Sequence, residues 1–257
     1  MYKVSIKMID SKHIKLVDPN AVDQEYLKFS NSNKKLDKIT EWLDVRKSDI
    51  KTFNITPAKS CPYAHDCQKV FKCYAIIQEE YRKDFKKQNK YNFDLLRKHH
   101  KSIDEMTDLI DRSLNEIKCK VLRIHSSGDF FNSRYLKAWL NVARNNSKII
   151  MYAYTTSIPY WIDNLDEINS LDNFKLIGSL GTNGQDYLIK KHNLQFSKVL
   201  FSENEANKLN LSIDWNERLA ISQNNNFALV IHGGQPAGHN SYKIKRLNLV
   251  RPNLALE

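Results

Sequence analysis

The sequence predicts an α/β fold: a parallel (β/α) barrel-like or partial barrel with a three-cysteine loop after the first barrel strand. From residue 119 onward, short apolar runs alternate with helical segments, a pattern that implies parallel strands joined by helical crossovers. The pattern allows about seven strand–helix units, a number that suits a complete or partial barrel better than a small open sheet. Six of the seven glycines stand at or just after a predicted strand end, the edge where parallel α/β folds form their sites.

The length of the chain allows one large α/β domain or two small ones. The chain has 257 residues and is 41% hydrophobic, enough for a sizeable core. We expect a single domain over 1–257, with an N-terminal packing segment (1–50), a barrel-like core (51–235) and a C-terminal tail (236–257). The N-terminus lacks the apolar region of a signal peptide, and no window is apolar enough to span a membrane. We therefore expect a cytoplasmic protein with reduced thiols and no membrane partner.

The charge balance points to a polyanionic partner. Lys and Arg outnumber Asp and Glu by 40 to 29, a formal net charge of +11. Such an excess is typical of proteins that bind nucleic acid, although a Lys- and Asn-rich chain from an AT-biased genome also drifts basic. A basic stretch between 83 and 101 is the candidate phosphate contact, and a solvated helix face is the alternative. The nucleic-acid-binding candidates within it are Lys86, Lys87, Lys90, Arg97 and Lys98.

The elements before residue 119 are mostly helical. Residues 4–8 alternate as in a short strand, and residues 52–55 form the strand that leads into the cysteine loop. Residues 76–117 are helical and highly charged. Within them, Ser102 and Glu105 form a capping box, which begins a helix with apolar residues on one face.

After residue 119 the pattern predicts alternating strands and helices. Helices are expected near 133–145, 160–169 and 185–192. The predicted strands are Val121–Ser126, Ile149–Thr155, Phe174–Gly178, Lys198–Phe201, Leu219–Ser222 and Ala228–Ile231.

The segment CPYAHDCQKVFKCYA, residues 61–75, holds three of the four cysteines. Five residues separate Cys61 from Cys67, and five separate Cys67 from Cys73, a density of soft ligands that favours a bound metal over disulfides. Structural zinc sites need four ligands, with cysteines usually two to four residues apart, and His65 could supply the fourth. Two gaps of five fit a loop around a [4Fe-4S] cluster better. We interpret the loop as an iron–sulfur site, with zinc or no metal as alternatives.

Cys119 is a poor fourth ligand. It precedes its strand, six residues ahead of His125. At ~3.3 Å per residue, it lies about 20 Å from the edge where the cysteine loop begins. We expect it to be a buried small hydrophobe.

The motif RIHSSGDFF ends the first strand after residue 119. It places His125, Ser127, Gly128 and Asp129 at the functional edge. His125 or Asp129 could face the cluster, bind a polar ligand or move protons. The alternatives are a hydrogen-bonded barrel histidine and a turn or helix-capping carboxylate.

Three later segments reach the same edge. Tyr154 and Thr155, in the motif YAYTTS, offer an aromatic ring and hydroxyls to the cavity. Residues 179–184 form a flexible polar loop that could hold an anion through backbone N–H groups. His232, in a glycine-rich loop, could close the site, the alternative being a mobile tail loop.

The chain resembles the phage "gene product 88" family, which are poorly characterised proteins of bacteriophages and other mobile elements. Three motifs carry the resemblance, in this order along the chain: CPYAHDC…CYA, RIHSSGDFFNSRYLKAW and YAYTTS. The resemblance covers roughly 53–160. Family members have a closer third cysteine than the five-residue gap here, and some carry further cysteines towards the C-terminus. The resemblance implies a phage or mobile-element origin.

The arrangement is also remotely similar to radical S-adenosylmethionine enzymes. In those enzymes a three-cysteine loop after the first barrel strand holds a [4Fe-4S] cluster, and a glycine-and-acid motif binds the methionine amino group. By that resemblance, Gly128 and Asp129 would stand at the amino group of the cofactor. The C-x3-C-x2-C spacing of the superfamily is absent here.

Three functions follow as hypotheses. The first is an iron–sulfur protein with radical S-adenosylmethionine-like chemistry. The second is a metal-stapled, basic protein that binds nucleic acid without catalysis. The third is a phage protein that antagonises a host defence complex through a protein interface. The substrate and the oligomeric state have no signature in the sequence.

Overall fold

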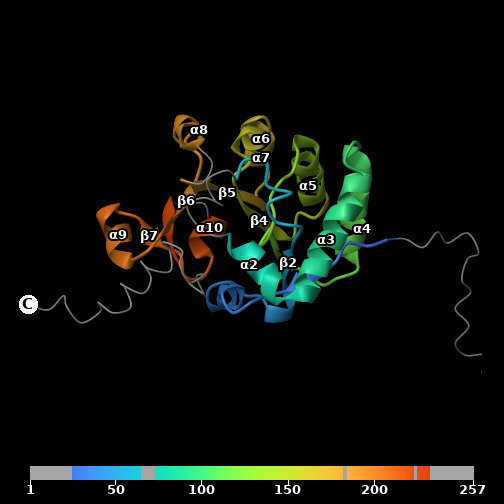
Figure 1. Ribbon diagram of the computed structural model, residues 1–257, viewed down its shortest axis with the longest axis horizontal. Coiled ribbons are helices and arrows are strands. Elements are labelled where there is room, and N and C mark those ends of the chain that lie inside the picture. The colour runs from blue at the N-terminus through green and yellow to red at the C-terminus, as the bar shows by residue number, and fades with distance from the viewer. Residues whose placement is uncertain (1–24, 65–72, 182–183, 223–224, 232–257) are drawn as a thin grey trace, which may run out of the picture.

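The computed structural model describes residues 25–64, 73–181, 184–222 and 225–231. These residues form one sheet with helices on both faces (Figure 1). The strands are β1 (Phe29–Asn31), β2 (Ile50–Phe53), β3 (Val121–Ile124), β4 (Ile150–Thr155), β5 (Phe174–Leu180), β6 (Phe196–Leu200), β7 (Ser212–Ile213) and β8 (Phe227–Val230). The helices are η2 (Leu36–Glu41), η3 (Lys47–Asp49), α2 (Tyr74–Tyr81), α3 (Lys83–Lys98), α4 (Ile103–Asn115), α5 (Ser133–Asn145), α6 (Ile158–Ile162), α7 (Leu165–Asn169), α8 (Asp186–Lys191), α9 (Glu203–Lys208) and α10 (Arg218–Ser222).

Eight strands pair in the described part of the chain, in the order β1-β2-β3-β4-β5-β6-β8-β7. β1 is antiparallel to β2, and every other pairing is parallel. The predicted α/β class with a parallel sheet is therefore confirmed. The order is linear, with β1 and β7 at its ends, so closure into a barrel stays a prediction.

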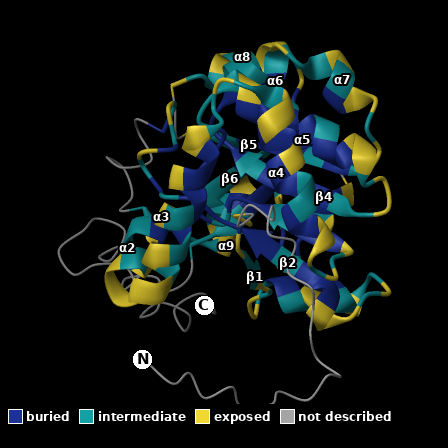
Figure 2. Ribbon diagram, turned by 90° about the vertical axis from the view of Figure 1, so that its right-hand side faces the viewer, coloured by how far each residue is buried: buried dark blue, intermediate teal, exposed yellow. Residues whose placement is uncertain are grey.

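The crossover helices cover one face of the sheet. Figure 1 shows α3, α4, α5, α6 and α8 in an arc above the strands. Leu122 and Ile124 of β3 share an apolar cluster with Leu136 and Trp139 of α5. Burying each such side chain stabilises the fold by roughly 1.5–3 kcal/mol. Figure 2 shows the result, with buried strands at the centre and exposed residues on the outward sides of the helices.

The opposite face of the sheet, called here the inner face, is covered by η2 and α10. Because successive side chains of a strand point to opposite faces, Val121 and Arg123 of β3 lie on this side, while Leu122 and Ile124 lie on the other. The inner apolar cluster joins Leu36, Ile39, Ile50, Val121, Tyr152, Ile177, Ala220, Ile221 and Phe227.

Residues 25–49, named here the N-terminal strap, connect the two faces. On the helical face, the amide of Leu27 donates to Ser113 Oγ of α4 at 2.8 Å. The chain then adds β1 to the sheet edge and turns onto the inner face as η2. There Trp42 Nε1 donates to the carbonyl of Asn216 at 2.9 Å. The strap thus fastens the first described residues to the last third of the chain.

One predicted strand is wrong. Residues Leu219–Ser222 form part of the helix α10, which buries Ala220 and Ile221 against the inner face. A short apolar run is compatible with either a buried helical turn or a strand, and periodicity alone does not separate them. The predicted helix at 160–169 is two short helices, α6 and α7, and strands β1 and β7 were too short to predict.

Other predicted elements are confirmed. β3, β4, β5, β6 and β8 overlap the predicted strands, and α5 matches its predicted range. The capping box is present, because Ser102 Oγ accepts from the amide of Glu105 at 3.2 Å. The predicted strand at 4–8 lies outside the described residues. None of the helices in the described ranges is long and apolar enough to cross a membrane.

Candidate functional site

The cysteine loop begins at the carboxyl-terminal edge of β2. After β2, the amide of Ile55 donates to the carbonyl of Ser127 at 3.1 Å, so the loop starts against the segment that follows β3. Cys61 lies in a turn in which its own amide donates to the carbonyl of Ala58 at 3.2 Å. These contacts concern the start of the loop; residues 65–72 lie outside the described residues, so the three-cysteine loop as a whole stays a prediction.

Cys61 is a half-buried free thiol. Burial, followed by the negative charges of Asp129 and Cys73, raises its pKa to about 12. Its Sγ lies 3.9 Å from Ser60 Oγ.

Cys73 immediately precedes α2, and its carbonyl accepts from the amide of Ile77 at 3.2 Å. The next residue, Tyr74, donates its hydroxyl to the carbonyl of Ser126. Both ends of segment 65–72 are therefore anchored to the segment after β3. Cys67 and His65 lie outside the described residues. Within the described ranges no group of three or more His, Cys, Asp or Glu side chains is placed to hold a metal, and those ranges include only two of the three loop cysteines, Cys61 and Cys73.

Gly128 lets the two segments approach closely. Its φ of +90° is a conformation that other residues adopt at a cost. A Cβ there would lie 2.4 Å from Ile55 Cγ1 and 2.8 Å from Ser60 Oγ. Glycine at this position therefore positions the start of the cysteine loop.

Asp129 is buried and its carboxylate is satisfied within the protein. Oδ1 accepts from the amide of Phe130 at 2.7 Å and from Thr155 Oγ1 at 2.6 Å. Oδ2 accepts from the amide and the hydroxyl of Thr156 at 2.8 and 2.7 Å. Burial raises the pKa of Asp129, against the effect of these hydrogen bonds. The carboxylate joins the ends of β3 and β4, which is the turn-stabilising role that the sequence left as an alternative.

His125 lies on the helical side of the sheet. Its Nε2 is 3.0 Å from the hydroxyl of Tyr135, and its ring packs edge-on against Phe130, with centroids 4.8 Å apart. Burial lowers the pKa of His125 to about 3, so the ring is neutral at physiological pH. Nδ1 is buried without a hydrogen-bond partner among the described residues. This surrounding is that of a core histidine.

Ser127 belongs to a buried polar network. Its amide donates to Asn54 Oδ1 at 2.9 Å, and its hydroxyl donates to the carbonyl of Ile55 at 3.1 Å. Asn89 Nδ2 of α3 approaches Ser127 Oγ at 3.4 Å. The serine therefore links the ends of β2 and β3 to α3.

Tyr154 and Thr155 point to opposite faces, as consecutive strand residues do. Thr155 contacts Asp129, whereas the hydroxyl of Tyr154 donates to Glu217 Oε2 at 2.8 Å on the inner face. The structure thus separates two residues that the sequence placed in one cavity.

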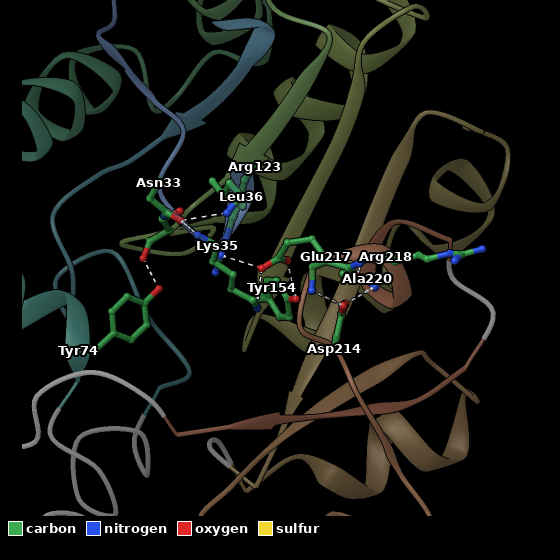
Figure 3. Close-up of polar contacts among 12 residues, drawn as sticks. Asn33, Lys35, Leu36, Tyr74, Arg123, Tyr154, Asp214, Glu217, Arg218 and Ala220 are labelled. Atoms are coloured by element: carbon green, nitrogen blue, oxygen red, sulfur yellow. Dashed lines mark hydrogen bonds and ion pairs between the residues drawn. The ribbon is translucent and has the colours of Figure 1, made fainter. Parts of the chain in front are cut away.

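Glu217 is the centre of a polar cluster that the sequence analysis missed. It is fully buried and holds a positive φ of 61°. Its Oε1 lies 2.6 Å from Lys35 Nζ and 3.4 Å from Arg123 Nη1. Figure 3 shows the side chains of Lys35, Arg123, Tyr154 and Glu217 converging from the strap, β3, β4 and the start of α10. Arg123 in the apolar run VLRI was the available signal, because an arginine in a strand covered on both faces needs a partner.

The cluster remains ionised. Burial disfavours a charged Glu217, but the charges of Arg123 and Lys35 lower its pKa overall. Burial likewise opposes the charge of Arg123, and the negative charge of Glu217 raises the pKa of the guanidinium. This is a buried ion network, which is costly to break because a lone charge would remain.

The predicted nucleic-acid residues lie along the exposed side of α3. Lys90 pairs with Asp94, and Lys98 pairs with Glu25 of the strap at 2.7 Å. Arg97 lies over the ring of Phe93, with its Cζ 5.8 Å from the centroid. Lys86 and Lys87 are exposed and form no ion pair within the described ranges. Ion pairs therefore involve Lys90 and Lys98, whereas Lys86 and Lys87 near the start of the helix form none within the described ranges.

A surface hollow of about 420 Å³ lies beside α6 and α7. It is lined in part by Lys137, Glu167 and His192, and it contains none of the predicted site residues. The remaining predicted site residue, His232, lies outside the described residues.

Comparison with known proteins gives relatives for most of the chain. The sequence profile described as "Gene product 88" matches residues 23–248. The chain is 34% identical over 145 residues to a "Gene 88 protein" of Mycobacterium phage D29, and 33% identical over 144 residues to one of Mycobacterium phage L5. Each alignment covers 50% of this chain and 58% of the relative, so the chain spans little more than half the length of these curated relatives. No solved structure matches.

The profile match extends well beyond 53–160, the range in which the three motifs carry the resemblance. It includes the strap, both sheet edges and α10, so the inner-face cluster falls inside the matched region. The two relatives are bacteriophage proteins. The chain belongs to the gene product 88 family.

Proposed function

We propose that this phage-type protein binds an iron–sulfur cluster through Cys61, Cys67 and Cys73 at the carboxyl-terminal edge of its sheet. The observation that carries the proposal is that both sides of segment 65–72 contact the segment after β3: Ser60, next to Cys61, accepts from the amide of Asp129, and Tyr74, next to Cys73, donates to the carbonyl of Ser126. Two sulfur ligands at one edge, with a third cysteine in the segment between them, form a suitable donor set for a [4Fe-4S] cluster. When bound, such a cluster supplies one-electron chemistry.

The residues around the loop have supporting roles in this proposal. Gly128 and Ser60 bring the first cysteine against the segment after β3. Tyr74, through its bond to the carbonyl of Ser126, holds the last cysteine at the same edge. Asp129 fixes the ends of β3 and β4 rather than offering a free carboxylate.

Metal and acid-labile sulfide analysis of protein purified without oxygen tests the proposal. We expect about four irons and four sulfides per chain, with brown absorbance. Cys61→Ser and Cys73→Ser should each lose most of this iron. Cys119→Ser is the matched control, because Cys119 lies at the opposite end of β3, where its Sγ donates to the carbonyl of Val121 at 3.5 Å.

Other results would change the assignment. Stoichiometric zinc in a colourless sample, lost in the same two variants, would make the loop a structural zinc site. Metal content that is zero, or that is unchanged in Cys61→Ser and Cys73→Ser, would reject a cysteine-bound metal altogether.

Reductive cleavage of S-adenosylmethionine is the enzymatic form of this proposal. It requires the reduced protein to release 5′-deoxyadenosine from the cofactor. Asp129 already accepts four hydrogen bonds from Phe130, Thr155 and Thr156, so the methionine amino group would need another acceptor or a rearranged turn. Failure to detect 5′-deoxyadenosine with any reductant, in protein that holds its cluster, would exclude this activity.

Nucleic-acid binding is the second candidate, and the exposed start of α3 favours it. Lys86 and Lys87 are exposed and form no ion pair within the described ranges, although the charge of Lys86 lowers the pKa of Glu79. We propose that they contact phosphates, which releases counterions and makes the affinity fall steeply with salt. Fluorescence anisotropy with a labelled DNA oligonucleotide measures this dependence.

Two double variants separate a direct phosphate contact from general charge. For Lys86→Gln with Lys87→Gln, we expect the slope of log K against log salt to shrink by about 0.7–0.9 for each phosphate that the protein no longer neutralises. Lys90→Gln with Lys98→Gln removes the same formal charge from lysines already paired with Asp94 and Glu25. Equal effects of the two double variants, or no binding at low salt, would reject the proposed contact.

A further inference from the structure

The guanidinium of Arg123 has an unoccupied binding edge. Its Nη1 makes a single long contact to Glu217 Oε1 at 3.4 Å. Its Nε is buried and has no hydrogen-bond partner among the described residues. Since Nε and Nη2 carry parallel N–H groups, this side of an arginine is the fork that binds a carboxylate or phosphate through two bonds.

The hydroxyl of Tyr152 is a second unsatisfied group beside that edge. Tyr152 is paired in register with Arg123 on the neighbouring strand and lies on the same face. It is fully buried, and its hydroxyl makes no hydrogen bond of ordinary geometry within the described ranges. Burial, then the charge of Glu217, raises the pKa of Tyr152, and the charge of Arg123 opposes them, which places the hydroxyl within the cluster. A buried hydroxyl without a partner costs free energy, so its retention calls for an occupant.

The other members of the cluster are already committed. Lys35 Nζ lies 2.6 Å from Glu217, and Tyr154 donates to the same carboxylate at 2.8 Å. Asp214 accepts from the amides of Asn216 and Ala220. The ring of Tyr154 lies 4.9 Å from Arg123 Cζ and supports the guanidinium from one side. These contacts hold Arg123 in place without using its Nε and Nη2 groups.

The cluster is partly exposed around a buried binding edge. The side chain of Arg123 is 13% exposed and that of Lys35 is 21% exposed, whereas Glu217 is completely buried. Arg123 Nε and the Tyr152 hydroxyl are themselves buried. Figure 3 shows Arg123 and Tyr154 on adjoining strands, with Lys35 and Glu217 approaching them from the inner side.

We propose that the inner face of the sheet binds a small oxyanion, the carboxylate or phosphate group of a ligand, through Arg123 Nε and Nη2 and the hydroxyl of Tyr152. Arg123 supplies the charge and the two-bond geometry, and Tyr152 donates a third hydrogen bond. Lys35 forms an ion pair with Glu217, so the positive charge of Arg123 is not fully compensated by the Glu217 carboxylate and can attract an anion. The proposal uses no residue of the cysteine loop and stands whether or not the loop holds a metal.

Nuclear magnetic resonance of the arginine Nε–H groups in the full-length, ¹⁵N-labelled protein tests the site. The Arg123 resonance is identified by its loss in Arg123→Lys or, should that variant not fold, by through-bond correlation to its backbone. Inorganic phosphate and formate are titrated separately, with chloride at matched ionic strength as the reference. We expect the Arg123 Nε–H resonance to move saturably with at least one of the two oxyanions and not with chloride. The oxyanion with the lower dissociation constant, phosphate or formate, identifies the chemical group that the site prefers.

Two variants locate the effect. Tyr152→Phe removes only a hydroxyl that makes no hydrogen bond of ordinary geometry within the described ranges and lies beside the Glu217 carboxylate, so its melting temperature should stay close to that of the wild type. Its oxyanion dissociation constant should rise about threefold to tenfold, the effect of removing one hydrogen bond. Arg144→Gln removes an exposed arginine on α5 that pairs with Glu167, and it should leave the titration unchanged. The proposal is overturned if neither oxyanion moves the resonance, if chloride moves it equally, or if Tyr152→Phe binds as tightly as the wild type.

Discussion

Gly128 determines how closely the cysteine loop approaches the segment after β3. In Gly128→Ala, the new methyl group would meet Ile55 Cγ1 and Ser60 Oγ in a backbone conformation with a φ of +90°. Strain and overpacking together should lower the free energy of unfolding by about 2–4 kcal/mol. Chemical denaturation measures this change.

Gly181→Ala is the matched control, because Gly181 also has a positive φ, of +83°, but no atom of the described residues lies within 4 Å of its added Cβ. It should lose about 1 kcal/mol through backbone strain alone. Similar losses in both variants would contradict the view that close packing against Ile55 and Ser60 requires glycine at position 128.

The sequence predicted which residues lie at the functional edge better than it predicted their partners. The motif at 125–129 does follow a parallel strand, as its position predicted. The bonds from Asp129 to Thr155 and Thr156 and from His125 to Tyr135 depend on side-chain direction and on neighbouring strands. Spacing along one strand contains neither of these, so the structural role of Asp129 could be raised only as an alternative.

At the scale of elements, the limits of prediction have a different cause. Long amphipathic segments such as α5 repeat their apolar residues over several turns, so their range was predictable. α10 has only five residues, and its apolar run fitted a strand equally well. Its helical state depends on the inner face that it covers, where Ala220 and Ile221 pack beside η2. Tertiary contacts, rather than local pattern, decide such short elements.

The same reasoning applies to the basic face of α3. Composition identified its lysines, but the pairing of Lys98 with Glu25 joins α3 to the strap across more than seventy residues of sequence. Only the structure separates such paired lysines from Lys86 and Lys87. This distinction is what makes the two double variants a matched comparison.

At the scale of the whole molecule, Glu217 connects the strap to the sheet and to α10. In Glu217→Gln, Lys35 and Arg123 would keep buried positive charge without a compensating carboxylate. We expect the variant to lose about 3 kcal/mol of unfolding free energy at pH 7. Thermal and chemical denaturation of the two proteins measure this difference.

The difference in unfolding free energy between the wild type and Glu217→Gln should depend on pH in a defined direction. The folded-state pKa of Glu217 lies below its ordinary value of 4.5, so ionised Glu217 contributes its full stability above pH 4.5. As the pH falls through the folded-state pKa, this contribution disappears and the gap between wild type and variant should narrow. Burial raises the pKa values of Asp129 and Asp214, so these two residues favour folding more as the pH falls. Because both proteins contain them, their contributions cancel in the difference between wild type and variant. A gap that stays constant down to acid denaturation would show that the charge of Glu217 does not stabilise the fold.

Both ends of the sheet are short strands, three residues in β1 and two in β7. The longer strands lie between them, and each has a hydrogen-bonded neighbour on both sides. A sheet edge with many free N–H and C=O groups is a template on which other copies of a chain can assemble into fibres. The described sheet offers little such template. We therefore expect concentrated solutions of this protein to resist strand-mediated polymerisation.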